Sequence, residues 1–158
     1  MPSEFERAAD ALLFTEELSF KTRGCSMQPL FVEHRDIVNI RTVKNGLRRG
    51  DVVLYPSKSG NALVLHRIIR IKGDDLLIRG DNNYFNEYRK KDEVVGIMTS
   101  FFRKGKYCDI KKSLRYKLYS FYILNSYFLR KNWYCRIKPR LSKLKRMILK
   151  KTDGKQSD

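Results

Sequence analysis

The apolar positions of the first hundred residues fall into short runs that predict β-strands. Six such runs can be distinguished, and turn sequences rich in Gly, Ser, Asn and Asp separate them. They are LSFKTR (18–23), DIVNIRTV (36–43), DVVLY (51–55), ALVLHRIIRI (62–71), DLLIR (75–79) and EVVGIM (93–98). Short strands at this density predict a small, mostly antiparallel β-fold that closes on itself as a partial barrel or as paired sheets.

One helix is expected before the strands. Ser3 and Glu6 have the spacing of a capping box, in which each side chain satisfies a backbone N–H at the start of a helix. Phe5, Ala8 and Leu12 follow at helical spacing. The pattern therefore predicts an N-terminal helix ahead of the β-fold.

After about residue 113 the apolar positions recur with a helical period. Residues 113–134 place Leu114, Leu118, Phe121 and Phe128 on roughly one helical face. The apolar centre of this segment is 12 residues long, whereas a helix that spans a bilayer needs about 20 apolar residues. We therefore expect a helix that does not cross a membrane.

A second basic helix is expected after Pro139, where Leu141, Leu144 and Ile148 share one face and lysines occupy other positions. Apolar and aromatic residues with Lys and Arg around them are typical of helices that lie in a membrane interface. Packing of both helices on the body of the protein, or on each other, is the alternative interpretation. The pattern leaves both open.

Positive charge is concentrated in the same region. The chain has 158 residues and a formal net charge of +17. Residues 101–158 hold 18 of the 34 basic side chains and 3 of the 17 acidic ones, which gives +15, whereas residues 1–100 carry only +2. We assign residues 1–105 to a folded body and residues 106–158 to a basic helical tail. This asymmetry indicates a polyanionic partner, either nucleic acid or an anionic membrane surface.

Cysteine usage and the N-terminal sequence bear on the compartment. Cys25, Cys108 and Cys135 are too few and too scattered for a disulfide scaffold, and none forms a Cys-x-x-Cys pair. Residues 1–20 lack the basic and apolar regions of a secretory signal. We therefore expect the chain to start in a reducing compartment, the cytoplasm.

Three residues of the body have the chemistry of a hydrolytic site. Ser26, His66 and Asp81 stand at the ends or turns of predicted strands. A serine hydroxyl becomes a nucleophile when a base within hydrogen-bond reach removes its proton, and histidine suits that role because its unperturbed pKa is about 6.5. A carboxylate fixes the imidazole tautomer and stabilises the imidazolium. Such a trio can be chosen from almost any chain, so the residue types alone do not establish the site.

Four short sequence motifs, here called boxes, indicate which serine, histidine and acid form the site. GCSMQPLF, RRGDVVLY, LHRIIRI and IRGDNN occur in this order between about residues 18 and 98. They resemble the conserved boxes of the signal peptidase I family, which shares its catalytic fold with the self-cleaving SOS-response repressors. The resemblance implies a small catalytic β-fold of the signal-peptidase type, and it does not extend to the tail.

The resemblance also implies roles for individual residues. The serine of the first box, Ser26, corresponds to the nucleophile. The third box supplies a lysine base in many bacterial enzymes and a histidine in the archaeal and endoplasmic-reticulum type, so His66 implies the second type. An acidic residue in or just after the Gly-Asp-Asn box completes that site. Asp81 is the first choice, and Glu87 is the rival because an aspartate often stands at that place.

These observations predict a serine endopeptidase with a Ser26-His66-Asp81 site and no metal or cofactor. The expected substrate is an extended leader or signal-type peptide segment that adds a strand beside the catalytic sheet, with small side chains near the scissile bond. Members of the family normally carry a transmembrane anchor, and this sequence shows none. We expect peripheral docking on the inner membrane face through residues 113–150, and we favour membrane over nucleic acid as the partner of the tail.

Two other classes of function would also use parts of this sequence. A self-cleaving transcriptional regulator would bind nucleic acid through the basic tail, but only about 20 residues precede the catalytic region, too few for a helix-turn-helix, and His66 stands where such repressors use lysine. A non-catalytic binding module on the same fold would have no need of Ser26, His66 and an acid. The substrate, the cleavage rule and the oligomeric state do not follow from the sequence.

Overall fold

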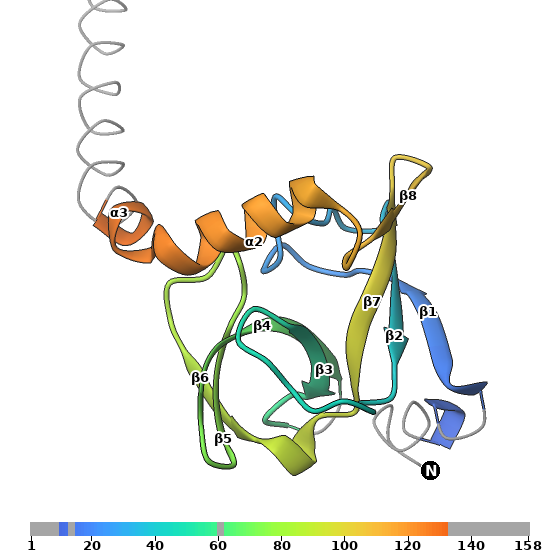
Figure 1. The fold of residues 1–158 in the computed structure, drawn as a ribbon, viewed down its shortest axis with the longest axis horizontal. Coiled ribbons are helices and arrows are strands. Elements are labelled where there is room, and N and C mark those ends of the chain that lie inside the picture. Colours follow the sequence, from blue (N-terminus) through green and yellow to red (C-terminus); the bar gives the residue numbers. More distant parts are fainter. Residues whose placement is uncertain (1–9, 13–14, 60–61, 133–158) are drawn as a thin grey trace, which may run out of the picture. The chain divides into compact units, whose positions relative to one another are not determined.

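One antiparallel sheet of eight strands organises the chain in the computed structural model, which describes residues 10–12, 15–59 and 62–132 (Figure 1). The strands are β1 (Glu17–Lys21), β2 (Ile37–Arg41), β3 (Val52–Pro56), β4 (Leu63–Lys72), β5 (Asp75–Arg79), β6 (Glu87–Lys90), β7 (Gly96–Arg103) and β8 (Lys106–Asp109). Their order is β1-β2-β7-β3-β4-β5-β6, and β8 also pairs with β7. The expectation of a mostly β, antiparallel fold is confirmed.

The six predicted strands all occur, with shifts of a few residues for most and identical bounds for β5. The run predicted to start at residue 93 begins later, at Gly96, because the short 3-10 helix η1 (Lys91–Glu93) precedes it. Strands β6 and β8 were not expected. They read EYRK and KYCD, and such polar sequences at a sheet edge lack the alternation that identifies a half-buried strand.

Only the end of the predicted N-terminal helix falls within the described residues. Residues 10–12 are helical, and Leu12 is buried. The capping box formed by Ser3 and Glu6 lies outside the described residues, as does the helix predicted after Pro139.

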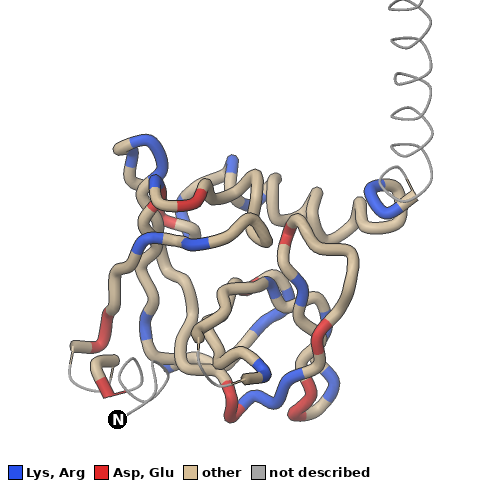
Figure 2. Tube along the Cα trace, turned by 180° about the vertical axis from the view of Figure 1, so that it is seen from behind, with Lys and Arg blue, Asp and Glu red and all other residues tan. Residues whose placement is uncertain are grey.

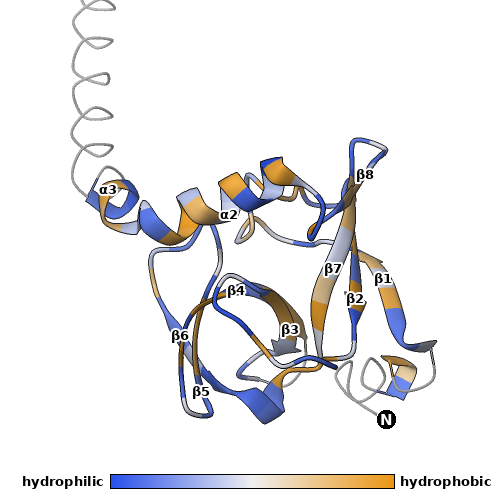
Figure 3. Cartoon of the chain, in the orientation of Figure 1, coloured by the Kyte–Doolittle hydropathy of each residue, from blue (hydrophilic) through white to orange (hydrophobic). Residues whose placement is uncertain are grey.

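The sheet buries apolar side chains on both of its faces, and β3 shows how. Successive side chains of a strand point to opposite faces. Val52 and Leu54 join the larger core cluster, whereas Val53 and Tyr55 join a smaller one with Ile68 and two residues of β5. Hydropathy drawn on the fold shows the apolar strands β3 and β4 at the centre and hydrophilic segments around β5 and β6 (Figure 3). A central strand with both faces buried provides a rigid base for the loops at its ends.

The folded body extends beyond the boundary expected at residue 105. Strand β8 pairs with β7 directly after that point, and helix α2 (Leu114–Asn125) buries Tyr116 and Ile123. Residues up to Leu124 form one compact unit, and Asn125 begins a second. The single helix expected over residues 113–134 is instead two, since α2 ends at Asn125 and α3 (Tyr127–Asn132) follows. Neither of these helices, nor any other in the described ranges, is long and apolar enough to cross a membrane.

Candidate active site

The turn after β1 carries Ser26, and the turn after β5 holds it in place. The backbone N–H of Asn82 donates to the Ser26 carbonyl over 2.8 Å, and the Asn82 side-chain amide donates to the Cys25 carbonyl over 3.1 Å. The N–H of Ser26 itself meets no acceptor among the described residues. The asparagine of the fourth box thus fixes the backbone on which the serine stands and leaves one N–H available.

Gly80 explains why that turn needs a glycine. A Cβ atom built on Gly80 would lie 2.7 Å from the Ser26 carbonyl oxygen and 2.9 Å from Nε2 of His66. Both distances are shorter than carbon atoms tolerate, and the first involves backbone that cannot move aside. The missing side chain therefore lets the serine turn and the His66 ring approach the same point. No hydrogen bond joins the Ser26 hydroxyl to His66 among the described residues, and such bonds are often long in a free site and tighten in the complex.

The other ring nitrogen of His66 faces a carboxylate and a phenol. Glu87, the first residue of β6, lies with Oε1 3.1 Å from Nδ1, and the Tyr55 hydroxyl lies 2.8 Å from the same atom. The His66 side chain is 5% exposed and that of Glu87 is 18% exposed. Tyr55 reaches His66 because Val53 pairs with His66 across β3 and β4, which makes Tyr55 its diagonal neighbour on the same face.

These contacts select one tautomer of the imidazole. A carboxylate oxygen at 3.1 Å from Nδ1 favours a proton on that nitrogen, because two lone pairs would repel each other. Burial, and then the charge of Glu87, raise the pKa of Tyr55 far above its usual range, so the phenol stays protonated and can donate to Glu87. Nδ1 then carries hydrogen, and the lone pair of Nε2 is left on the side of Gly80 and Ser26. This is the tautomer that a general base requires.

His66 stays neutral near pH 7. Burial lowers the pKa of its imidazole below the ordinary 6.5, while the charges of Glu87 and Asp81 act in the opposite direction. A neutral imidazole with a free Nε2 lone pair can accept a proton. No group of three or more His, Cys, Asp or Glu side chains in the described part of the chain is arranged to hold a metal ion.

Asp81, the first-choice acid, has a different principal partner. Its carboxylate accepts two hydrogen bonds from Arg67, from Nε over 2.8 Å and from Nη2 over 2.7 Å, and the Tyr119 hydroxyl donates a third over 3.1 Å. The side chains of Arg67 and Asp81 are both 0% exposed. Burial, the largest single influence, lowers the pKa of Arg67, but the charge and hydrogen bonds of Asp81 together with the contact to Tyr116 outweigh it and raise that pKa, so the guanidinium remains charged.

The alternation of β4 separates the two acids. His66 and Arg67 are consecutive residues of this strand, so their side chains point to opposite faces. Glu87 meets the first and Asp81 meets the second. The contact with the imidazole thus belongs to Glu87, the rival, and not to Asp81, the first choice, while the catalytic role of either acid stays a prediction.

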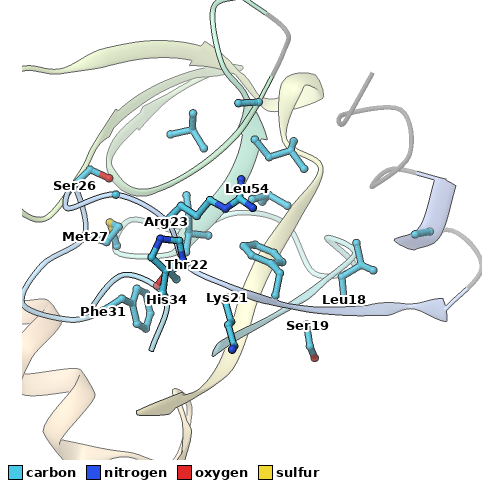
Figure 4. Close-up of a pocket in the computed structure, with 17 residues that line it drawn as sticks. Leu18, Ser19, Lys21, Thr22, Arg23, Ser26, Met27, Phe31, His34 and Leu54 are labelled. Carbon is cyan, nitrogen blue, oxygen red and sulfur yellow. The ribbon is translucent and has the colours of Figure 1, made fainter. Parts of the chain in front are cut away.

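A long cavity of about 840 Å³ leads away from Ser26. Residues of β1 line one part of it, and Ala62 to Leu65 at the start of β4 line another. Figure 4 shows Ser26 at one end of this cavity and Leu18 and Ser19 toward the other. Among the described residues, β1 pairs only with β2, and β4 pairs with β5 only from Arg67 onward. Two strand edges with free backbone groups therefore border the cavity.

The lining of the cavity is mostly apolar, with Leu54, Leu63 and Phe31 among its residues. Among the described residues that line it, the charged ones are basic, Lys21 and Arg23, and none is Asp or Glu. Such a cavity suits an extended chain with small or apolar side chains and accommodates neutral or acidic ones better than basic ones.

No family model matches the chain. Among curated proteins, it is similar to Signal peptidase I U of Bacillus subtilis (strain 168), with 32% identity over 92 residues. The aligned region covers 54% of this chain and 49% of that relative, so the chain spans about half the length of the curated relative it matches. The similarity supports the resemblance carried by the four sequence boxes.

The two acids are expected to differ in their effect on stability. Asp81→Asn leaves the buried Arg67 guanidinium without its counter-charge and should lower the free energy of unfolding by about 3–5 kcal/mol. Glu87→Gln should lower it less, because its imidazole partner remains neutral. Urea unfolding at pH 7.5, followed by circular dichroism, measures both, and the pair Arg67→Gln with Asp81→Asn should recover part of the loss. A larger loss for Glu87→Gln would contradict this assignment.

The imidazole of His66 is expected to titrate below pH 6.5, and Glu87→Gln should lower its pKa further, because the carboxylate favours the charged ring. NMR of the imidazole protons measures this, with His34→Gln to distinguish the two histidines of the chain. Since the folded pKa lies below the unfolded one, the unfolded chain binds the proton first. The contribution of His66 to stability is therefore complete above pH 6.5 and is lost as the pH falls toward the folded pKa. A higher pKa in Glu87→Gln is the opposite of the expected result.

Proposed function

On the premise that this chain is a distant relative of signal peptidase I, we propose that it is a serine-type endopeptidase that cuts an extended peptide segment. One observation carries the proposal. Nδ1 of His66 lies against Glu87, while Nε2 lies beside Gly80 next to the backbone of Ser26. This arrangement gives a serine, a base and an orienting acid in the order that nucleophilic catalysis needs.

In the proposed reaction, Nε2 of His66 removes the proton from the Ser26 hydroxyl as the oxygen attacks the substrate carbonyl. The resulting imidazolium is stabilised by Glu87, and it returns the proton to the leaving amine. Water then repeats the sequence on the acyl-enzyme and releases the second product. The N–H of Ser26, which meets no acceptor in the described part of the chain, serves as a donor to the oxyanion.

Asp81 acts in this scheme as a positioning residue. Its hydrogen bonds to Arg67 fix the turn that contains Gly80 and Asn82. Asn82 then donates hydrogen bonds to the carbonyls of Cys25 and Ser26. Its negative charge also favours the imidazolium, since it raises the pKa of His66. Both acids therefore support the reaction, Glu87 through direct contact and Asp81 through the backbone and its charge.

The substrate proposed here is a leader or signal-type peptide segment, taken up as an added strand. The cavity beside Ser26 is bordered by the unpaired edges of β1 and of the start of β4 among the described residues. An extended peptide there gains backbone hydrogen bonds from a strand edge and places alternate side chains in the apolar lining. The chain matches only about half the length of its relative, so the substrate class rests on this geometry.

Ser26→Ala should abolish peptide cleavage and labelling by a fluorophosphonate, with little change in the thermal midpoint, because the hydroxyl is the reacting atom. Cys25→Ala is the matched control, since Cys25 is the exposed neighbour in the same turn, and it should keep both activities. Loss of labelling in Cys25→Ala but not in Ser26→Ala would sink the assignment. A native chain that is neither labelled nor active would favour the non-catalytic binding module.

Glu87→Gln should reduce turnover by about 10⁴-fold, because the amide no longer fixes the required tautomer or stabilises the imidazolium. Glu93→Gln is the control, because both Glu93 and Glu87 pair with Arg89, whereas of these two acids it is Glu87 that contacts His66. Turnover of a fluorogenic peptide at pH 8, measured on variants with native circular dichroism, tests this. Similar rates for the two variants would remove Glu87 from the catalytic site.

A further inference from the structure

The outer face of α2 exposes a row of large apolar side chains. Leu114, Leu118, Phe121 and Tyr122 are 69%, 61%, 68% and 55% exposed. Their spacings of three, four and eight residues place them on one side of the helix. Leaving this many large apolar groups in contact with water on one helical face is unfavourable, and it marks a surface that another structure covers.

The opposite face of the same helix packs against the body of the protein. Tyr116 and Ile123 are buried there, and the hydroxyls of Tyr116 and Ser120 accept hydrogen bonds from Arg67. Figure 1 shows α2 lying along one side of the sheet, and Figure 3 shows apolar and hydrophilic bands alternating along it. The exposed row is therefore a second apolar face of a docked helix and does not result from a helix that failed to find its core.

Basic residues flank the exposed row on both sides. Arg115 and Lys117 are exposed and lie on either side of Leu114 and Leu118 around the helix. Lys111 and Lys112 precede the helix. No Asp or Glu occurs in the sequence between Ile110 and Thr152, and α2 accordingly carries no acidic position in Figure 2.

We propose that the outer face of α2 is a docking surface for an anionic lipid bilayer. The apolar row enters the boundary between headgroups and acyl chains, and the basic flanks reach the headgroup phosphates. A second copy of the chain fits less well, because it would bring Arg115 and Lys117 against their own counterparts in a protein of net charge +17. A nucleic acid backbone would satisfy the charges but offers Leu114 and Leu118 no apolar surface to bury against.

Docking through this face would place the candidate active site close to the membrane. The inner face of α2 contacts both members of the Arg67–Asp81 pair, through Tyr116, Tyr119 and Ser120. An α-helix is about 10 Å across, so this pair lies roughly one helix diameter from the proposed lipid surface. The docking surface does not depend on the proposed peptidase activity, and binding can be measured in a protein that cleaves nothing.

The test is co-sedimentation of the full chain with vesicles of phosphatidylcholine alone and of phosphatidylcholine with phosphatidylglycerol. We expect binding to the mixed vesicles and much weaker binding to the neutral ones. The triple variant Leu114→Gln/Leu118→Gln/Phe121→Gln should lose at least about 100-fold in affinity, and Arg115→Gln/Lys117→Gln should lose roughly 30-fold on anionic vesicles only. Glutamine maintains helix propensity, and circular dichroism confirms the fold of each variant.

The matched control is Phe85→Gln/Tyr88→Gln, which removes two aromatic side chains that are 64% and 76% exposed elsewhere on the body. It should bind vesicles as the native chain does. The proposal is overturned if the control loses as much affinity as the triple variant, or if the triple variant binds as the native chain does. It is also overturned if sedimentation velocity shows a dimer that the triple variant abolishes without native vesicle binding, or if the chain binds only nucleic acid.

Discussion

The buried pair of Arg67 and Asp81 is the interaction on which the candidate site depends. Arg67 belongs to β4 and Asp81 to the turn after β5, and the guanidinium also donates to the carbonyl of Gly50 and to hydroxyls of α2. Removing two charges from water costs nearly as much as their attraction returns, so the pair adds little net stability. Its effect is on arrangement. All three guanidinium nitrogens of Arg67 donate to particular acceptors, so the segments that supply those acceptors tolerate few alternative positions.

The turn fixed in this way determines the geometry around the serine. Gly80 precedes Asp81, and its missing side chain gives space to the Ser26 carbonyl and the His66 ring. Asn82 follows and binds the serine turn through two hydrogen bonds. Gly80 thus gives space, Asp81 binds Arg67 and Asn82 binds the serine turn. The ion pair with Arg67 fixes the position of all three residues. The side chain of His66 points to the other face of β4, where its Nδ1 meets Glu87 of a separate strand, β6.

Much of the fold and part of the site could be predicted from the sequence. Alternating apolar runs predicted six strands that the structure contains, and the four boxes predicted Ser26 and His66 as site residues, which the structure places on either side of Gly80. The choice between Asp81 and Glu87 could not be made in the same way, because it depends on which face of β4 each acid meets across the sheet. That register is set by pairing between strands distant in sequence. Glu87 also stands in β6, whose sequence EYRK carries no strand pattern. Tyr55 was not predicted as a site residue for a similar reason. In DVVLY it has the pattern of a core aromatic, and its contact with His66 depends on the pairing of β3 with β4.

The orientation of helix α2 could not be predicted from the sequence either. The sequence placed Leu114, Leu118 and Phe121 on one face, but it could not tell whether that face turns toward the body or toward solvent. The answer comes from the other face, where Tyr116, Tyr119 and Ser120 carry hydroxyls that meet the buried Arg67 and Asp81. Leaving a buried charge without hydrogen-bond partners costs far more free energy than leaving a leucine exposed to water. Satisfying the ion pair therefore outweighs the gain from packing more apolar side chains on the sheet. The polar requirement of the ion pair therefore orients the helix, and the leucines are turned outward as a consequence.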